Sequence, residues 1–528
     1  MPISRPENLL TMSGSEQRLV LPDDEHNRKL VGNVHPSDWV NPEPSERYNI
    51  VVIGAGTAGL VTAVVAAGIG AKVALIERHL MGGDCLNVGC VPSKGLIRAS
   101  KAWADLRDAA EYGLTIPPGV RYDFGRAMER MRRLRARISH TDSAHRYKSL
   151  GVDVYIGAAR FSSDDRVTVE GPAGNRTLRF VKAAICTGAR AAAPGIPGLD
   201  EAGYLTNETV FSLTELPARV GVIGAGPIGC ELAQAFARFG SQVSLVETMH
   251  GIMPNEDRDA AAIVQQAMAR DGVALLCCGR DLKVSKTDGG KRLSVNSHDR
   301  QYDVTVDEIL IGVGRTPNVE GLGLEAVGVE YDKAGVKVND RLQTTNPKIF
   351  AAGDVCSRYK FTHAADAMAQ IVIQNALFPH PLGLGYASMN SVIMPWCTFT
   401  EPEIAHVGMY EADAKKQGIE VETYTFKLDE VDRAILDGEE EGFARIHIKK
   451  GTDRLLGATI VAAHAGDIIN EFSVLMKAGA GVKTLAATIH PYPTQAEVNK
   501  KAVNLWRKAH FTPQTKAWLA KLFAWMRR

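Results

Sequence analysis

Cys85 and Cys90, in the segment GGDCLNVGCVPSK, are the residues whose type and spacing most clearly could carry chemistry. Thiols five positions apart at the start of a helix come close enough for a disulfide, although the geometry is tight. A structural disulfide that closes so short a loop would restrict the unfolded chain little. A metal site would need two further ligands at suitable spacing, and none follows in this segment. The pattern therefore favours a redox-active pair over a structural disulfide or half of a metal site.

A glycine turn precedes the cysteines, with Gly54, Gly56 and Gly59 spaced as G-x-G-x-x-G between an apolar strand and a helix. Such a turn lets a pyrophosphate approach the backbone at the N-terminus of the helix. Glu77 follows Gly54 by 23 positions, at the end of the next strand, where a carboxylate can accept hydrogen bonds from ribose hydroxyls. Together these features predict a dinucleotide-binding fold.

The same unit recurs over Arg219–Glu247, with Gly224, Gly226 and Gly229 in its turn and Glu247 at its second strand end. Recurrence makes the prediction much stronger than a single glycine turn would. The three residues after Glu247, TMH, include no arginine to hold a 2′-phosphate, and a carboxylate repels that group. The second unit is therefore expected to bind NADH in preference to NADPH.

Two further strand ends belong with the first unit. Thr187 and Gly188 follow one apolar strand, and Asp354 ends the segment AAGD after another. Each alone is typical of a plain strand-to-loop turn. In a chain with two nucleotide turns, a carboxylate at this place favours a flavin, whose ribitol Asp354 could hold, so FAD is the expected cofactor of the first unit.

Composition sets outer limits on function. The chain has 528 residues, a formal net charge of +1 and 45% hydrophobic residues, so no charge imbalance points to a nucleic-acid partner. No apolar run approaches the roughly 20 residues of a membrane span, and the N-terminus carries no apolar signal segment. Eight cysteines in so long a chain are no disulfide scaffold, so a reducing, cytoplasmic compartment is expected.

Changes in hydrophobic pattern and polar composition divide the chain into parts. A polar extension without clear periodicity, lying on the surface or partly ordered against it, is expected over 1–47, and an amphipathic tail over 511–528. Between them we expect an FAD-binding domain over 48–190 and 319–386, an NAD(P)-binding domain over 191–318 and an interface domain over 387–510. Within the last of these, the pattern predicts one long helix over Asp467–Ala478.

The segment GGDCLNVGCVPSK, the doubled glycine turns, the GRTPN run and AAGD resemble the flavoprotein disulfide reductases, which include dihydrolipoamide dehydrogenase, glutathione reductase and mercuric ion reductase. The resemblance covers about Tyr48 to Phe511. It implies an α/β fold with two Rossmann-like nucleotide-binding domains and an α+β C-terminal dimerisation domain. It also implies a homodimer whose active site is shared across the subunits.

The resemblance further implies roles for single residues. Cys90 would be the thiol beside the flavin, and Cys85 the thiol that meets the substrate. Lys94 and Glu231 match an ion pair that lies near the flavin, with Lys94 also a flavin contact. Gly83 would contact FAD and Gly314 would contact NAD.

The C-terminal segment bears on the branch of the family. Thiol-reducing members carry a pattern that resembles H-x-H-P-T-x-x-E, with a histidine base and an acidic partner. This chain reads HPYPTQAE, so Tyr492 takes the place of the base, His490 stands two residues earlier and Glu497 is the acidic residue. A tyrosine has an ordinary pKa near 10, which makes it a poor base at neutral pH. Mercuric ion reductase has a tyrosine at this place and a second one where Tyr204 falls, although Tyr204 could equally be a packed surface residue.

Two departures from mercuric ion reductase leave the acceptor open. The last residues given are Trp525-Met526-Arg527-Arg528, where mercuric ion reductases carry a Cys-Cys pair, and an N-terminal C-x-x-C domain is not expected. The one vicinal pair, Cys277-Cys278, is expected in the core of a strand, so no resident metal site is predicted. A metal ion or another acceptor is therefore expected, with dihydrolipoamide dehydrogenase acting through His490 as the alternative. An alternative of another class is a flavin-bearing protein that binds a membrane or a partner.

Two basic or amphipathic segments bear on partners. Hydrophobic residues recur at helical spacing through the tail, between lysines and arginines. This pattern is typical of a membrane-surface or partner helix, but packing within a dimer is the preferred interpretation. The run Arg130–Arg137 is expected to be the solvated face of a long helix, not a nucleic-acid site.

Overall fold

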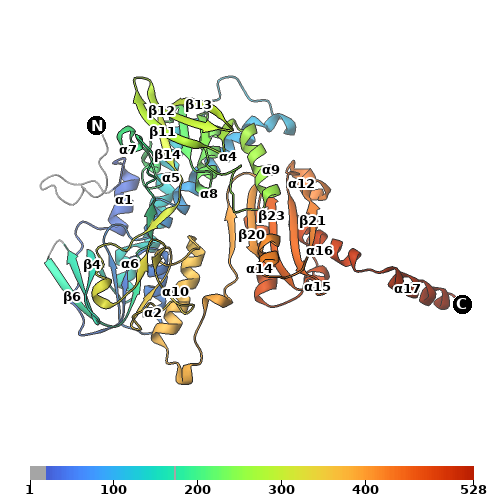
Figure 1. The fold of residues 1–528 in the computed structure, drawn as a ribbon. Helices are drawn as coiled ribbons and strands as arrows, with labels where there is room; N and C mark the ends of the chain where they lie inside the picture. The colour runs from blue at the N-terminus through green and yellow to red at the C-terminus, as the bar shows by residue number, and fades with distance from the viewer. Residues whose placement is uncertain (1–19, 172–173) are drawn as a thin grey trace. The chain divides into compact units, whose positions relative to one another are not determined.

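The computed structural model describes residues 20–171 and 174–528 of the chain (Figure 1). The described part divides into two compact units. The first holds the residues up to Thr248 together with Gly272–Val392, and the second holds Met249–Asp271 together with Ile393–Arg528. The part of the predicted extension over residues 1–19 lies outside the described residues.

The first nucleotide fold is built on a sheet whose central strands are parallel in the order β3-β2-β1-β6, with β18 pairing along β6. Strands β4 and β5 extend the sheet antiparallel beyond β6. Helices α2 and α10 pack against each other, and α10 also contacts β1, β6 and β18. The bounds are β1 (Tyr48–Ile53), α2 (Thr57–Gly68), β2 (Val73–Glu77), β3 (Val152–Ile156), β4 (Ala158–Ser163), β5 (Arg166–Gly171), β6 (Gly174–Ile185), β18 (Ile349–Ala351) and α10 (Thr362–Leu377).

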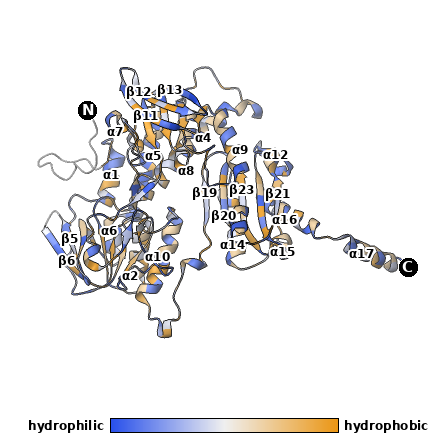
Figure 2. Cartoon of the chain, in the orientation of Figure 1, coloured by the Kyte–Doolittle hydropathy of each residue, from blue (hydrophilic) through white to orange (hydrophobic). Residues whose placement is uncertain are grey.

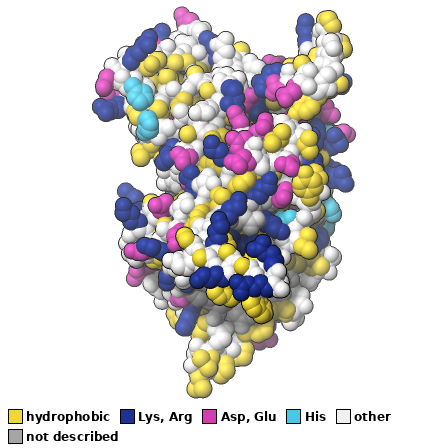
Figure 3. All heavy atoms as spheres, turned by 90° about the vertical axis from the view of Figure 1, so that its right-hand side faces the viewer, with side chains coloured by type: hydrophobic (Ala, Val, Ile, Leu, Met, Phe, Trp, Pro, Cys, Tyr) yellow, Lys and Arg dark blue, Asp and Glu magenta, His cyan; other side chains and the backbone are white. Residues whose placement is uncertain are grey.

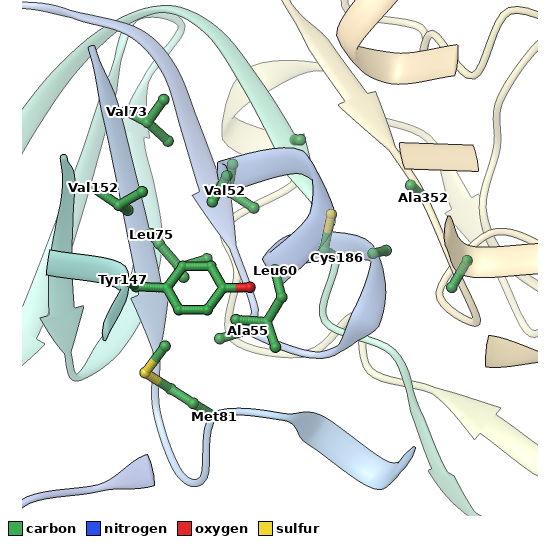
Figure 4. Packing of buried hydrophobic residues seen from close by; sticks show 14 of the residues in the cluster. Val52, Ala55, Leu60, Val73, Leu75, Met81, Tyr147, Val152, Cys186 and Ala352 are labelled. Atoms are coloured by element: carbon green, nitrogen blue, oxygen red, sulfur yellow. The ribbon is translucent and has the colours of Figure 1, made fainter. Parts of the chain in front are cut away.

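Buried apolar residues hold this sheet against its helices. In Figure 4, Val52, Leu75 and Val152 from the three parallel strands lie near Leu60 of α2 and the ring of Tyr147. These strand residues are at most 1% exposed, as expected for parallel strands covered on both faces. The packing fixes the strand ends at which the first glycine turn and the cysteine segment begin.

A second parallel sheet in the same unit runs in the order β10-β9-β8-β14. The antiparallel strands β11, β12 and β13 form a separate three-stranded sheet. Both sheets contribute to one apolar cluster around Ile223, Leu293 and Ile309. The bounds are β8 (Arg219–Ile223), α8 (Pro227–Phe239), β9 (Gln242–Val246), β10 (Val273–Leu276), β11 (Arg280–Thr287), β12 (Gly290–Ser297), β13 (Arg300–Val306) and β14 (Glu308–Ile311).

Shorter elements connect these sheets. Strands β7 and β15 pair with each other, as do β16 and β17. The helices α3 and α4 carry the cysteine segment. The bounds are α3 (Gly83–Asn87), α4 (Cys90–Arg107), α5 (Phe124–Ile138), α6 (Ala144–Ser149), β7 (Ala189–Ala191), α7 (Leu199–Ala202), β15 (Arg315–Pro317), β16 (Tyr331–Asp332) and β17 (Gly335–Val336).

The second unit is built on an antiparallel sheet in the order β19-β20-β23-β22-β21. Figure 2 shows hydrophobic residues along its strand β23, each of which is buried. The bounds are α9 (Arg258–Arg270), β19 (Pro395–Thr398), β20 (Glu403–Gly408), α11 (Glu411–Lys416), β21 (Val421–Lys427), α12 (Asp432–Asp437), β22 (Phe443–Lys449), β23 (Leu455–Ala462), α13 (Ala465–Ile468), α14 (Asn470–Lys477), α15 (Val482–Ala487), α16 (Glu497–Ala509) and α17 (Pro513–Met526).

The prediction of one long helix over Asp467–Ala478 is wrong, because α13 ends at Ile468 and α14 begins at Asn470. The side-chain amide of Asn470 donates to the carbonyls of Gly466 and Asp467, at 3.2 and 3.3 Å. An asparagine that takes backbone carbonyls in this way competes with the helical pattern. This competition was not visible in the hydrophobic spacing.

The interpretation of Arg130–Arg137 as a solvated face is also wrong for two of its residues. Arg132 and Arg135 are 7% and 2% exposed. Both face α1 (Glu25–Val34), a helix within the expected extension, where Arg132 pairs with Asp24 and Arg135 donates to Asn27 Oδ1 at 2.7 Å. The polar partners of these arginines lie 108 residues earlier in the chain, so local spacing carried no sign of them.

The tail forms the helix α17, and none of its residues is buried. Trp518, Phe523, Trp525 and Met526 are more than half exposed. Figure 2 shows hydrophobic and hydrophilic residues alternating along this helix. Figure 3 shows Lys and Arg side chains beside hydrophobic ones on one face of the chain. Among the described residues, no helix is long and apolar enough to cross a membrane.

Candidate active site

Cys85 lies in α3 and Cys90 is the first residue of α4, so the two thiols flank the short break between these helices. Cys85 is partly buried and Cys90 is exposed. The Sγ of Cys90 lies 3.3 Å from the Oγ1 of Thr362, the first residue of α10. Sequence reasoning missed Thr362, because nothing in the sequence brings the start of α10 to the cysteines.

The two thiols differ in acidity. A hydrogen bond from the Cys85 thiol lowers the pKa of Cys90 to about 6. The Thr362 hydroxyl and the Lys94 ammonium also lower this pKa, whereas partial desolvation of the sulfur and the Glu231 charge raise it. The same contact with Cys90, together with burial, raises the pKa of Cys85. The pair therefore presents one thiolate, on Cys90, and one protonated thiol, on Cys85, at neutral pH. A lowered thiol pKa at a helix start is the usual mark of a reactive cysteine.

Three polar side chains hold the loop between the cysteines. The Asn87 amide donates to the carbonyls of Met81 and Gly83, at 3.0 and 2.9 Å. The buried guanidinium of Arg135 donates to the carbonyl of Asn87 at 2.6 Å, and Asn207 donates to the carbonyl of Val88 at 3.3 Å. These contacts fix the loop that joins the helices of Cys85 and Cys90. The two thiols are therefore held in place relative to each other, as a redox-active pair requires.

The predicted partners Lys94 and Glu231 form an ion pair, with Nζ and Oε2 2.8 Å apart. Glu231 lies on α8 and is 6% exposed, whereas Lys94 lies on α4 and its side chain is 35% exposed. Helices α4 and α8 pack against each other, which joins the cysteine segment to the second nucleotide fold. Burial of a carboxylate on this apolar helix is costly without a cation, so Lys94 stabilises the charge of Glu231.

The first glycine turn fits a bound dinucleotide. A side chain at Gly54, whose φ is +101°, would place its Cβ 2.4 Å from the carbonyl oxygen of Cys186, and one at Gly59 would place it 1.8 Å from that of Gly54. Helix α2 begins at this turn without a side-chain cap, which leaves its first amides to a phosphate. Glu77 accepts from the amide of Ala55 at 2.7 Å, at the end of β2. Gly56 also lies beside Gly83, because a Cβ added to Gly83 would lie 2.7 Å from the Cα of Gly56.

Arg315 joins two acidic residues near the first turn. Its guanidinium pairs with Asp84, the neighbour of Cys85, and its Nε lies 3.3 Å from an oxygen of Asp354. Burial raises the pKa of Asp354, and the Arg315 charge opposes the rise. Sequence reasoning assigned Gly314 from the GRTPN run but not Arg315, although the same run was the signal that could have found it.

The remaining residues assigned to the flavin lie at the ends of neighbouring strands. Thr187 and Gly188 follow β6, and Asp354 follows β18, which pairs with β6. The Thr187 hydroxyl donates to the carbonyl of Asn318 at 2.7 Å. These strand ends lie at the carboxyl edge of the parallel sheet, where nucleotides bind in such folds.

The second glycine turn has the same construction as the first. Helix α8 begins after Gly226 without a side-chain cap, and a Cβ on Gly229 would lie 1.9 Å from the carbonyl oxygen of Gly224. Glu247 accepts from the amide of Ala225 at 2.8 Å, as Glu77 does from Ala55. Gly314, with a φ of +66°, lies just before β15. The residues present therefore fit a second dinucleotide.

The predicted residues Tyr492 and Glu497 lie in the C-terminal segment of the second unit. Tyr492 is 69% exposed, and its hydroxyl donates to Asp432 at 2.7 Å, which raises the pKa of Tyr492. His490 instead pairs with Glu471, with Nε2 and Oε1 3.0 Å apart, and its side chain is only 4% exposed. One oxygen of Glu497, Oε2, is buried without a hydrogen-bond partner among the described residues.

Tyr204 lies in the first unit, where its partly buried side chain packs against the apolar cluster around Leu199 and Ile309. Three residues later, Asn207 donates to Val88 between the two cysteines. The segment of Tyr204 thus contacts the cysteine loop.

Comparison with known proteins identifies this arrangement. Residues 48–369 match the family described as pyridine nucleotide-disulphide oxidoreductase, and residues 394–503 match the dimerisation domain of the same family. The chain belongs to this family. The predicted α/β fold class, the flavoprotein disulfide reductase family and its enzyme activity are therefore confirmed. The family implies FAD and a nicotinamide cofactor, and its dimerisation domain supports a homodimer.

Relatives come from more than one branch of the pyridine nucleotide-disulphide oxidoreductases. The mercuric reductase of Staphylococcus aureus is 33% identical over 456 residues, which is 86% of this chain and 82% of that protein. A dihydrolipoyl dehydrogenase of Bacillus subtilis is 32% identical over 458 residues, which is 86% of this chain and 95% of that protein. The Cu(II) complex of a mutant of RclA, an HOCl-induced flavoprotein disulfide reductase of Escherichia coli, superposes with a TM-score of 0.77 at 29% identity, over 87% of this chain and all of that one. The oxidoreductase is thus mercuric reductase-like, and identity alone does not fix its acceptor.

Proposed function

We propose that this oxidoreductase passes electrons from NADH through Cys85 and Cys90 to a soft metal ion, in preference to a dithiol or disulfide. The observation that carries the proposal is that Tyr492, the residue at the place of the family's general base, cannot act as one. Tyr492 donates its hydrogen to Asp432 and has a raised pKa, so it is not a general base at neutral pH. A metal ion held by two thiolates needs electrons more than a proton shuttle.

The chain's own groups prepare the cysteines for this role. FAD, when bound, supplies two-electron chemistry between the nicotinamide and the disulfide. Thr362, Lys94 and the Cys85 thiol stabilise the thiolate of Cys90. Above about pH 6, Cys90 is therefore already deprotonated and can bind a metal ion without first losing a proton. Cys85 keeps its proton until a metal ion displaces it, because its pKa is raised. Arg135 and Asn87 hold the loop so that both sulfurs can bind the same ion.

The overall reaction balances with one nicotinamide. One NADH gives up two electrons and leaves as NAD⁺, with release of one proton. These two electrons reduce one Hg(II) to Hg(0), or two Cu(II) to two Cu(I). Mercuric reductases and the Cu(II) complex of RclA among the relatives support a soft metal as the acceptor class.

We also propose the domain assignment and the shared active site. FAD would occupy 48–190 with 319–386, NAD(P) would occupy 191–318, and 387–510 would form the interface. Exposed apolar residues in the second unit support a covered dimer surface, since large exposed patches mark such contacts; they are Ile435, Leu436, Val474, Ile489 and Tyr492, exposed by 47, 70, 68, 89 and 69%. Tyr492 and Glu497 would then reach the cysteines of the partner subunit, with Tyr204 beside them.

Glu247 supports NADH as the donor in place of NADPH. Its carboxylate accepts from the turn amide of Ala225 and would meet the ribose, where a 2′-phosphate would be repelled. Steady-state kinetics with both nucleotides test this preference. A KM for NADPH at or below that for NADH would contradict it.

The decisive experiment is a turnover screen with NADH and four acceptor classes: Hg(II), Cu(II), disulfides including oxidised lipoamide, and quinones. We expect metal-dependent oxidation of NADH that is lost in Cys85→Ser. Tyr492→His should raise turnover with lipoamide and leave metal reduction nearly unchanged. Faster turnover of wild type with lipoamide than with either metal ion would overturn the proposal.

One observation favours a second candidate, dihydrolipoamide dehydrogenase activity. His490 and Glu471 form a histidine–carboxylate pair, and Asn499 donates to the same carboxylate at 2.8 Å. Such a pair is the usual construction of a general base. Its burial argues against it, since the His490 side chain is 4% exposed. High dihydrolipoamide:NAD⁺ turnover that His490→Ala abolishes would establish this second function.

A further inference from the structure

A second group of sulfur and nitrogen donors lies outside the redox centre. Cys277 and Cys278 follow the end of β10, and His298 lies in the turn between β12 and β13. The Sγ of Cys277 lies 3.4 Å from the Nε2 of His298. The three possible ligand atoms lie within 4.8 Å of one another. The expectation that the cysteine pair sits in the core of a strand holds for the burial of Cys277. It is wrong for the strand, because β10 ends at Leu276, and for Cys278, which is partly exposed.

Backbone contacts bring these residues together. The hydroxyl of Ser297 donates to the carbonyl of Cys277 at 2.6 Å, which ties the hairpin turn to the strand end. His298 and Asp299 have φ of +50° and +60°, as in a two-residue hairpin turn with both central residues left-handed. Cys278 also has a left-handed φ, +55°, which is costly for a residue with a side chain. The turn and the strained residue place the thiols and the imidazole on one side of the loop.

From this arrangement we propose a metal site at Cys277, Cys278 and His298 that binds a thiophilic cation of the Zn(II) class. Two thiolates and an imidazole are the donors that such ions prefer. Because zinc holds sulfur at about 2.3 Å and nitrogen at about 2.0 Å, the donor atoms need to move by roughly 1 Å or less to close around it. Binding displaces the thiol protons, so it weakens as pH falls.

The site adjoins the residue that we assign to the nicotinamide nucleotide. The amide of Glu247 donates to the carbonyl of Leu276 at 3.0 Å, and the amide of Gly279 donates to the carbonyl of Glu247 at 2.8 Å. The vicinal cysteines lie between these two contacts. A cation bound there would therefore clamp the loop beside Glu247 to the β12–β13 hairpin, and it would do so apart from the electron path through Cys85 and Cys90.

The experiment must separate this site from the redox pair, which also binds soft metals. The FAD-loaded variant Cys85→Ser/Cys90→Ser, kept reduced, is titrated with Zn(II) against a chromophoric chelator. We expect one Zn(II) per chain in this background. Adding Cys277→Ser/Cys278→Ser should remove that zinc, and adding His298→Ala should weaken it by tenfold or more. Adding Cys397→Ser, a partly buried thiol in the second unit, should leave it unchanged and serves as the matched control.

Hydrogen exchange gives a readout that does not depend on the chelator. Zn(II) should slow exchange of the backbone amides of 277–279 and 298–300 in the same background. Stoichiometry that Cys277→Ser/Cys278→Ser leaves unchanged, or no Zn(II) bound at micromolar concentration, would overturn the proposal. Neither result would bear on turnover with soft metals at Cys85 and Cys90.

Discussion

Thr362→Val is expected to make Cys90 a weaker acid by about one pKa unit. The hydroxyl of Thr362 lies 3.3 Å from the Cys90 sulfur, and it acts to lower a pKa that stands at about 6. Hydrogen bonds to charged groups contribute roughly 1.5–3 kcal/mol. Because Cys90 is exposed, water screens the contact, and we take about 1.4 kcal/mol, which corresponds to about one pKa unit.

The assay is a pH titration of the long-wavelength absorbance of the two-electron-reduced enzyme, which reports a thiolate beside the oxidised flavin. Since the pKa of Cys90 is lowered, its thiolate persists as pH falls and is lost near pH 6 in wild type. At pH 6 the thiolate fraction should fall from about a half to about a tenth in Thr362→Val, whereas near pH 9 the two proteins should be alike. Cys85 does not interfere, because its pKa is raised.

Thr362→Ser is the matched control, because it keeps the hydroxyl and removes only a methyl group. Its midpoint should stay within about 0.3 units of the wild-type midpoint. A Thr362→Val midpoint equal to wild type would refute the assigned hydrogen bond. An equal shift in both variants would show that packing of α10 matters, and not the hydroxyl.

Three further predictions follow from the same contacts. Lys94→Met should raise the titration midpoint of Cys90 and Glu231→Gln should lower it, because their charges act on that pKa in opposite directions; shifts of the same sign would contradict this. Gly229→Ala should abolish flavin reduction by NADH in stopped-flow measurements while the FAD absorbance is retained, since the added Cβ would meet the Gly224 carbonyl at 1.9 Å; normal reduction rates would show that the turn can relax. Arg135→Met should destabilise the protein by about 2–3 kcal/mol, because it leaves the Asn87 carbonyl without its buried charged donor. Thermal unfolding of Arg135→Met, compared with that of the exposed control Arg137→Met, measures this loss of stability. Equal melting temperatures of the two variants would refute the prediction.

Much of the candidate site was predictable because its signals are local. The glycines, the strand-end carboxylates and the cysteine spacing are each fixed by contacts within one βαβ unit, so order along the chain carries them. The ion pair of Lys94 and Glu231 came from resemblance, and apolar neighbours around Glu231 indicated its burial. Residues whose partners are distant in sequence were missed, as Thr362, Arg315 and Arg135 show.

The sequence by itself determined the family, and it predicted the two nucleotide turns and the redox pair, since each depends on residues that are neighbours in the chain. Only the tertiary structure decided which groups set the acidity of Cys90, because Thr362 lies 272 residues away and reaches it through packing of α10. It also decided that His490 pairs with Glu471 and Tyr492 with Asp432, and that His298 meets Cys277. Side-chain partners of this kind depend on how sheets and helices pack, which local spacing does not encode.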